Sequence, residues 1–230
     1  MYRQEINAMK KDILRGLKTA FPIALGYLPL GMAFGILAAQ QGLTALDVFF
    51  LSFLVYAGSA QFIASAMISS GAASAAIILT TFLVNLRHLL MSASLAPYLK
   101  HISSPVLAWI STGITDETFA AGYPEASSGK VTPAFYIGLH CLSHASWIFA
   151  TVTGCLLGTR ITNPEKWGLD FALPAMFIAL LFMQLKNKKD ILVALAAGIL
   201  STALAFVLKD NFNIIAATMT AASVGVLIEK

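Results

Sequence analysis

The chain has 230 residues, of which 58% are hydrophobic and 11% are charged, with a mean hydropathy of +0.78. A soluble domain carries about 25% charged residues, so this chain has too little polar surface to cover itself in water. The composition excludes a soluble globular protein and indicates an all-α, polytopic membrane protein embedded in a lipid bilayer. The net charge of +4 is no sign of nucleic-acid binding, because the basic residues cluster at the ends of apolar runs, where membrane topology explains them. We therefore expect no nucleic-acid partner.

Apolar runs of membrane-spanning length recur along nearly the whole chain. A run of about 17 to 25 apolar residues can cross the roughly 30 Å hydrocarbon core as a helix. We predict helices over 17–40, 46–70, 73–97, 105–121, 133–158, 168–185, 190–208 and 211–228. Short polar connections leave no room for a soluble domain, so we expect a single integral membrane domain over residues 1–230.

The basic residues predict the topology. A basic cluster precedes the first apolar run and places the N-terminus in the cytoplasm; it consists of Lys10, Lys11, Arg15 and Lys18. The run that follows is too long for a signal peptide and ends in "GILAAQQG", a poor cleavage site, so we interpret it as a retained helix.

The number of spans depends on one short segment. The cluster Lys186, Lys188 and Lys189 should also be cytoplasmic, which requires an even number of crossings before it. Counting the segment 105–121 as a crossing gives eight transmembrane helices, and seven is the alternative.

The second predicted helix has weak sequence similarity to a later stretch of the chain. At a shift of 115 residues, "LVYAGSAQFIA" (54–64) matches "LDFALPAMFIA" (169–179) at six of eleven positions. Chance similarity is the alternative, because these residues are common in membrane helices. A true internal repeat would divide the chain into halves of about 16–121 and 131–228, and would predict discontinuous helices and a binding site near the midplane.

The stretch "TTFLVNLRHLLMSASLAP" (80–97) places an arginine near the centre of an apolar helix. An arginine at that depth costs about 2.5 to 3.5 kcal/mol, so Arg87 must face the bundle interior or an aqueous cavity. Two interpretations are open. Arg87 forms a structural ion pair with Asp47, Asp116 or Glu117, or it binds an anionic part of a substrate.

Other polar residues accompany this arginine. His88 lies about 100° around the helix from Arg87, so it is either a proton carrier or a hydrogen-bonded packing residue. The stretch "GITDETF" carries Asp116 and Glu117 at the end of the short fourth segment. At membrane depth these acids could neutralise Arg87 or hold an ammonium group; if the helix ends earlier, they form an ordinary solvated helix end.

Small residues interrupt two of the apolar helices. "VYAGSAQF" puts Gly58, Ser59 and Gln61 in mid-helix, where an interruption would present backbone amides and a positive dipole end to an anion. The alternative is close packing, with the glutamine as an interhelical hydrogen bonder. "GYLPLGMAFG" carries Gly31 and Gly35 at GxxxG spacing, which predicts a helix-packing seam, either within the chain or with a partner subunit.

The sequence gives little support for metal, redox or hydrolytic chemistry. His140 and His144 share a helical face at metal-binding spacing, but no third ligand is nearby, so we expect neither a metal nor another cofactor. Cys141 and Cys155 are about 21 Å apart along one predicted helix and cannot pair within it. An intramembrane hydrolase would need Ser59 as nucleophile and His88 or His144 as base, yet "AGSA" lacks the nucleophile-elbow pattern.

Five stretches resemble, in order and in spacing, the AzlC family, the large subunit of bacterial branched-chain amino acid exporters. They are "GYLPLGMAFG", "VYAGSAQF", "LVNLRHLLMSASLAP", "GITDETF" and "GLDFALPAMFIALL", and the resemblance covers about residues 16–228. It implies export of leucine, isoleucine and valine, sometimes methionine, across the cytoplasmic (inner) membrane, with a small AzlD-type hydrophobic subunit. The family's motifs fall on Gly58, Ser59, Ala60 and Gln61, on Asn85, Arg87 and His88, and on Asp116 and Glu117.

The residues are compatible with that implication. A branched-chain amino acid is a zwitterion on an apolar stalk, so its carrier needs partners for one carboxylate and one ammonium. We expect Arg87, with the backbone near Gly58 and Ser59, to receive the carboxylate, and Asp116 or Glu117 to receive the amine. No Gly-rich phosphate loop is present, so proton coupling through His88 or the acidic pair is expected rather than ATP. A passive channel for small zwitterions is the alternative.

Overall fold

The computed structural model of the chain describes residues 2–129 and 131–161 without a gap, and separate stretches beyond them up to residue 225, of which 187–207 is the longest. The chain divides into two compact units, Met1–Pro174 and Ala175–Lys230. All regular elements among the described residues are helical, which confirms the predicted all-α class.

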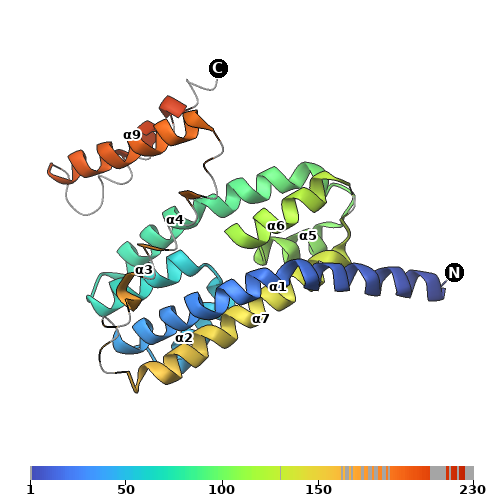
Figure 1. The fold of residues 1–230 in the computed structure, drawn as a ribbon, viewed down its shortest axis with the longest axis horizontal. Helices are drawn as coiled ribbons and strands as arrows, with labels where there is room; N and C mark the ends of the chain where they lie inside the picture. The colour runs from blue at the N-terminus through green and yellow to red at the C-terminus, as the bar shows by residue number, and fades with distance from the viewer. Residues whose placement is uncertain are drawn as a thin grey trace. The chain divides into compact units, whose positions relative to one another are not determined.

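Helices α1 (Tyr2–Gln40) and α7 (Pro133–Gly158) form the central pair of the first unit. They lie side by side in Figure 1, and their contacts advance together along the sequence: Gly16 meets the backbone of Phe135, and Gly35 meets the backbone of Thr151. The two helices are therefore parallel. The predicted helix 133–158 has the bounds of α7, whereas α1 begins fifteen residues before the predicted start at 17.

A glycine seam holds α1 against α7. It consists of Gly16, Gly31 and Gly35 in α1 and Gly138, Gly154 and Gly158 in α7. A Cβ atom at Gly35 would lie 2.0 Å from the Thr151 carbonyl oxygen, and one at Gly154 would lie 2.3 Å from the Met32 carbonyl oxygen. Only glycine permits backbones to approach so closely. The packing seam predicted at Gly31 and Gly35 is thus confirmed, and its partner is α7 of the same chain.

The predicted helix 46–70 is broken into a hairpin, which we call hairpin A. Helix α2 (Ala45–Phe50) continues as the π-helical turn η1 (Leu51–Val55), and α3 (Gly58–Ser69) begins after a reversal at residues 56 and 57. The outer ends of the hairpin lie together, because residues 41–43 and residues 68 and 69 line one pocket of about 660 Å³. The expectation of one continuous crossing over 46–70 is therefore wrong.

Helix α4 (Ser74–Leu95) and a 3-10 turn (Ala96–Tyr98) lead back to the end of the unit where α1 begins. There Leu99 and Ile102 pack in one cluster with Phe135, which itself contacts the N-terminal part of α1. Helix α4 therefore runs antiparallel to α1 and α7, in agreement with the predicted helix 73–97.

The predicted segment 105–121 is a second hairpin, which we call hairpin B. Helix α5 (Ser104–Thr112) ends at Gly113, and α6 (Asp116–Ser127) runs back. The tip of hairpin B reaches the middle of α1, where Thr115 contacts Tyr27, while the far end of α6 returns to the N-terminal part of α1, where Glu125 lies 3.8 Å from Arg15. The expectation of one helix ending at residue 121 is therefore wrong.

Helix lengths distinguish crossing elements from hairpins. Among the described residues, three helices are long and apolar enough to cross a membrane: Arg3–Gln40, Ser74–Tyr98 and Pro133–Gly158. At about 1.5 Å per residue, the longer arm of either hairpin spans roughly 18 Å, about half of the hydrocarbon core. The hairpins thus enter from opposite ends of the unit and meet in the middle. The expected count of seven or eight spans is not confirmed.

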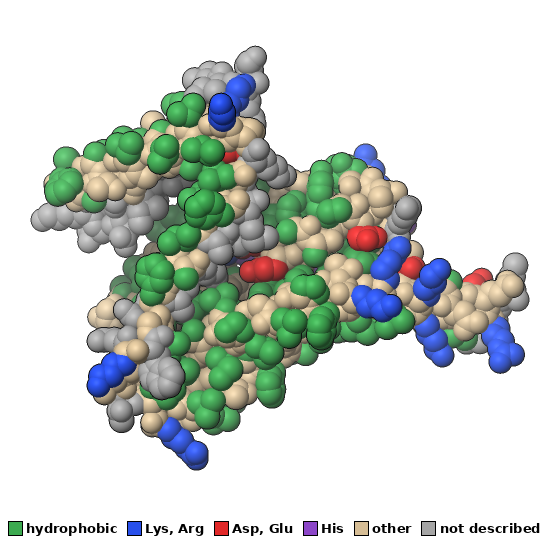
Figure 2. Space-filling model, in the orientation of Figure 1, with side chains coloured by type: hydrophobic (Ala, Val, Ile, Leu, Met, Phe, Trp, Pro, Cys, Tyr) green, Lys and Arg blue, Asp and Glu red, His purple; other side chains and the backbone are tan. Residues whose placement is uncertain are grey.

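Charge agrees with this arrangement. Lys and Arg side chains gather over the N-terminal turns of α1 (Figure 2), and Lys100 follows α4 at the same end of the unit. At the opposite end, the loops between residues 40 and 74 carry no lysine or arginine, and Arg160 lies there after α7. The larger group of basic residues thus lies at the N-terminal end of α1.

The second unit contains α9 (Lys188–Ala205), which overlaps the predicted helix 190–208. Asn187 caps this helix by accepting a hydrogen bond from the Asp190 backbone amide at 3.0 Å. The predicted helices 168–185 and 211–228 lie partly outside the described residues, as does the second copy of the predicted repeat.

The hairpin topology predicts which loops share a side of the membrane. In a variant without Cys141 and Cys155, single cysteines at Gln40 and Ser70 should react with an impermeant maleimide from the same side. Cysteines at Glu5 and His101 should react from the other side. Intact cells compared with inverted vesicles give the sidedness. Labelling of the Ser70→Cys variant from the side opposite to Gln40→Cys would mean that hairpin A crosses the membrane.

The seam predicts a sharp contrast between two glycines of α1. Gly35→Ala should lower the thermal unfolding temperature in detergent, because overpacking typically costs about 1–3 kcal/mol. Gly26→Ala is the matched control: no atom lies within 4 Å of its Cβ position, and alanine favours helix. Equal stability of the two variants would contradict the close approach of α1 and α7.

Candidate functional site

Arg87 joins the tips of both hairpins. It projects from the middle of α4, and its Nη1 atom lies 2.8 Å from the Asp116 carboxylate at the start of α6. Its Nη2 atom donates a hydrogen bond to the Ser59 hydroxyl in the first turn of α3. The side chains of Arg87 and Asp116 are 27% and 19% exposed, so solvent screens this ion pair only in part. The structure therefore brings three of the predicted site residues into direct contact.

The start of α3 offers donors and no negative charge. The chain reverses at Tyr56, whose φ of 45° lies in the left-handed region, and the Ala57 side chain provides no cap. The first intrahelical bond described there runs from the Gln61 amide to the Ala57 carbonyl, so the amides of the first turn have no partner within the helix. The first turn of α3 contains no acidic residue. Its positive dipole end and the nearby Arg87 guanidinium together favour an anion.

The start of α6 has the opposite character. Thr115 caps the helix by accepting a bond from the Thr118 amide at 3.3 Å, and Asp116 and Glu117 occupy the first turn. Among the described residues, Glu117 forms no ion pair with Arg87. Its Oε2 atom accepts a 2.8 Å hydrogen bond from the Tyr27 hydroxyl, which also contacts the Thr115 hydroxyl at 2.8 Å. Tyr27 thereby ties the tip of hairpin B to α1.

The charges at the two tips are close to balance. One guanidinium and two helix N-termini, each equivalent to about half a positive charge, face two carboxylates. A neutral ligand with separated charges can bind here without changing the net charge, whereas a simple anion or cation would leave an uncompensated charge in a partly buried site. The electrostatics thus suit a zwitterion.

Three polar atoms around the tips are buried and have no hydrogen-bond partner among the described residues: Tyr56 Oη, Asn85 Oδ1 and Arg87 Nε. Buried polar groups in folded proteins nearly always have partners, which are often water or a ligand. Arg87 Nε is a donor, which suits a carboxylate. Asn85 Oδ1 and Tyr56 Oη can accept a hydrogen bond, which suits an ammonium group.

Two predicted site residues make other contacts. The Gln61 amide is fully buried; it accepts a bond from Trp147 Nε1 at 2.9 Å and donates to the Ser52 hydroxyl at 3.0 Å. Gln61 is therefore an interhelical hydrogen bonder, as in the packing alternative.

His88 donates through Nδ1 to the Asn85 carbonyl at 3.0 Å, within its own helix. Gly58 is the first residue of α3 and is partly buried.

The two histidines of α7 have structural surroundings. His144 donates through Nε2 to the Ser52 carbonyl of the π-helical turn at 3.1 Å, and its ring packs on Tyr56. His140 is buried against Gly113, where a Cβ atom would lie 2.1 Å from His140 Nδ1. The described residues contain no group of three or more metal-binding side chains. The Ser59 hydroxyl accepts a hydrogen bond from Arg87, and no histidine bonds to it among the described residues.

Sequence reasoning missed Tyr27, Tyr56 and Thr115. Tyr27 and Tyr56 stand inside the two stretches that were singled out for their glycines, "GYLPLGMAFG" and "VYAGSAQF". The signal available for Thr115 was its place directly before an acidic pair, which is typical of a helix N-cap. That signal would have placed a helix start, rather than a helix end, at residues 116 and 117.

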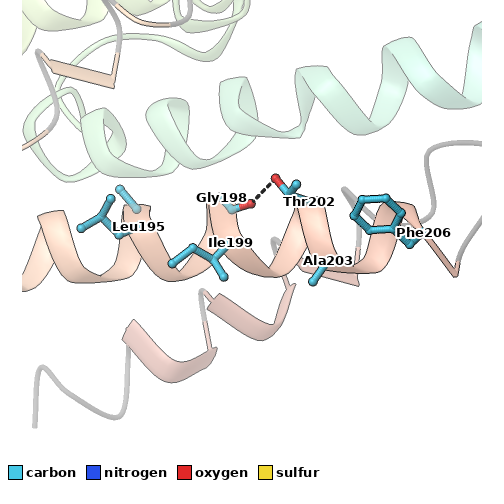
Figure 3. Close-up of a pocket in the computed structure, with 7 residues that line it drawn as sticks. Leu195, Gly198, Ile199, Thr202, Ala203 and Phe206 are labelled. Carbon is cyan, nitrogen blue, oxygen red and sulfur yellow. Dashed lines mark hydrogen bonds between the residues drawn. The ribbon is translucent and has the colours of Figure 1, made fainter.

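The second unit carries a different kind of surface. A groove of about 560 Å³ runs along α9; among the described residues, its lining consists of residues of α9 and of Phe206 directly after it. Figure 3 labels Leu195, Gly198, Ile199, Thr202, Ala203 and Phe206. The polar contact drawn there joins the Thr202 hydroxyl to the Gly198 carbonyl at 2.8 Å. The described residues that line the groove carry no charge.

Comparisons with known proteins agree with the motifs. The sequence profile of the family described as AzlC protein matches residues 22–161, which include both hairpins. The inner membrane protein YgaZ of Escherichia coli is 30% identical over 189 residues, covering 80% of this chain and 77% of YgaZ. A membrane protein of Helicobacter pylori is 33% identical over 201 residues, covering 84% of this chain and 87% of that protein.

A third relative has a name that states a function. The branched-chain amino acid transport protein AzlC of Bacillus subtilis is 27% identical over 227 residues, covering 96% of this chain and 88% of that protein. No solved structure gives a significant match. With the family profile covering more than half of its length, this chain belongs to the AzlC family of membrane transport proteins.

Proposed function

We propose that the protein is the large subunit of a secondary transporter that exports branched-chain amino acids, namely leucine, isoleucine, valine and also methionine, across the inner membrane. Its N-terminus lies in the cytoplasm, and a small hydrophobic AzlD-type subunit is its partner. Family membership and the name of the Bacillus subtilis relative support a transport role. Direction, proton coupling and partner belong to the proposal alone.

The observation that carries the proposal is the bridge by Arg87 between the two hairpin tips. One end of the site offers Arg87 Nε, which is buried without a partner, together with the uncapped start of α3. The other end offers the carboxylates of Asp116 and Glu117. The substrate carboxylate binds at the first end, where it competes with Asp116 for the guanidinium. Asp116, once displaced, faces the substrate ammonium.

The same contacts bear on the alternatives. Ser59 is bonded to a cation, whereas a serine nucleophile needs a base, so the geometry supports transport rather than hydrolysis. The two tips meet as half-helices from opposite ends, which supports a carrier that closes on its ligand. His88 lies next to Arg87 on α4, and His88 with the acidic pair are the candidates for carrying the coupled proton.

A charge swap separates substrate binding from a merely structural ion pair. Arg87→Gln alone leaves Asp116 unpaired, so it should weaken both folding and export. The neutral pair Arg87→Gln with Asp116→Asn should fold, because no unpaired charge remains, yet should reduce leucine transport roughly 30-fold or more. The exchange Arg87→Asp with Asp116→Arg should also fold and fail to transport. Thermal stability and labelled leucine transport in proteoliposomes are measured together.

The swap has a clear contrary outcome. If the exchanged pair restores transport as well as stability, the ion pair is structural, because a structural pair tolerates exchange of its two partners. The matched control is Arg15→Glu with Glu125→Arg at the outer end of α6. That pair has a separation of 3.8 Å, and its exchange should leave transport unchanged.

Inverted membrane vesicles test direction, coupling and partner. Labelled leucine should accumulate inside them when a small partner subunit is co-expressed and a proton gradient is imposed. An uncoupler should abolish that accumulation. Accumulation that ignores the uncoupler would contradict proton coupling, and flux that rises linearly with leucine concentration would indicate a channel. Equal accumulation without the small subunit would contradict the proposed partnership.

A further inference from the structure

Tyr56 occupies an unusual backbone position at the tip of hairpin A. Among the described residues, it is the one non-glycine residue with a positive φ, at 45°. The left-handed region strains a bulky aromatic residue, and glycine would adopt it freely. A strained backbone conformation of this kind persists only where the surrounding structure enforces it, and such residues cluster at active sites and ligand-binding sites.

The Tyr56 side chain is held in a fixed orientation. The residue is 4% exposed, and its ring packs on the His144 ring with centroids 4.2 Å apart and on the edge of the Tyr27 ring at 6.5 Å. His144 is itself fixed by its bond to the Ser52 carbonyl. The strained backbone and the two rings together determine where the hydroxyl points.

That hydroxyl lies close to the Tyr27 side chain and to the acidic end of the site. The Glu117 carboxylate is near enough to act electrostatically on it, and Tyr27, whose hydroxyl donates to Glu117, is its ring neighbour. Within the described residues, Tyr56 Oη is nevertheless buried without a hydrogen-bond partner. A polar atom so placed, near the Glu117 carboxylate and the uncapped start of α3, is free to bond a water or a ligand.

We propose that Tyr56 is a substrate-binding residue whose phenolic oxygen accepts a hydrogen bond from the primary ammonium of the substrate. This inference rests on the proposed function and extends it, because it assigns the third partner of the amine. A primary ammonium has three N–H donors, and Tyr56, Glu117 and Asp116 supply three acceptors. The site therefore selects zwitterions with a free primary amine, and it binds N-methylated amino acids and amine-free carboxylates more weakly.

Tyr56→Phe tests the proposal with little structural disturbance, since it keeps the ring, its packing and the backbone. Tyr136→Phe is the matched control. Tyr136 is also buried with an unpartnered hydroxyl, but it lies on α7 against Gly122 of α6, away from the tips. Thermal shift of the purified protein with its partner subunit gives apparent affinities for three probes: leucine, N-methylleucine and 4-methylpentanoate, which lacks the amine.

The expected pattern is specific to the amine. Tyr56→Phe should weaken leucine binding about threefold to tenfold, as expected for loss of one hydrogen bond, and should leave the binding of 4-methylpentanoate unchanged. Tyr136→Phe should bind all three probes as the wild type does. The preference of the wild type for leucine over N-methylleucine should shrink in Tyr56→Phe alone.

Each other outcome overturns a different statement. If Tyr56→Phe binds leucine as tightly as the wild type does, the assignment of Tyr56 is wrong, whereas the proposed function stands. If Tyr56→Phe weakens leucine and 4-methylpentanoate equally, the hydroxyl does not act on the amine. If no primary-amine zwitterion stabilises the wild-type protein, both the assignment and the proposed function are wrong.

Discussion

A guanidinium at mid-membrane depth must be matched by other polar groups, and the structure meets this constraint by bringing two broken helices to Arg87. Hydrocarbon offers no partner to an unpaired charge or to the backbone groups at a helix end. Ser59 at the start of α3 and Asp116 at the start of α6 share the one arginine. The Arg87 guanidinium thus provides a polar partner at both helix breaks, and Asp116 at one of these breaks neutralises the charge of Arg87.

The rest of the first unit divides into a packed part and a polar part. The glycine seam brings the backbones of α1 and α7 into direct contact over most of the length of α7, which fixes that pair closely. Buried apolar contacts hold both hairpins against the pair, and polar contacts of Tyr27, Gln61 and His144 join them to it as well. Arg87 joins the two tips to α4. A ligand that competes for these contacts acts on the tips without having to repack the pair.

How far the sequence predicted the structure differs from element to element. The helix 133–158 was predicted correctly, because Thr132 caps it, Pro133 begins it and apolar residues run on without interruption. Hairpin A was predicted as one helix, since the apolar run through Leu54 and Val55 reads as helical and a left-handed tyrosine has no signature in the sequence. The glycine and serine that follow nevertheless marked the interruption.

The candidate site shows the same limits. Arg87, Ser59 and Asp116 were recognised individually, because polar residues in apolar helices are costly and therefore conspicuous. A pair between Arg87 and Asp116 was one of several interpretations left open, and the choice among them could not be made, since it depends on two hairpins that each reverse midway. Tyr27 and Tyr56 escaped notice because an aromatic residue in a membrane helix is ordinary until its hydroxyl is found buried beside a carboxylate. The roles of all these residues stay predictions.

The central claim is that a zwitterion binds between the two hairpin tips, and substrate protection tests it most directly. A cysteine is placed at Gly58, at the tip of hairpin A, and in a second variant at Ser70, at its outer end, both without Cys141 and Cys155. The rate of alkylation by a small thiol reagent is measured with and without leucine. We predict that leucine slows modification at position 58 and leaves position 70 unchanged. Equal rates at position 58 with and without saturating leucine would contradict the account.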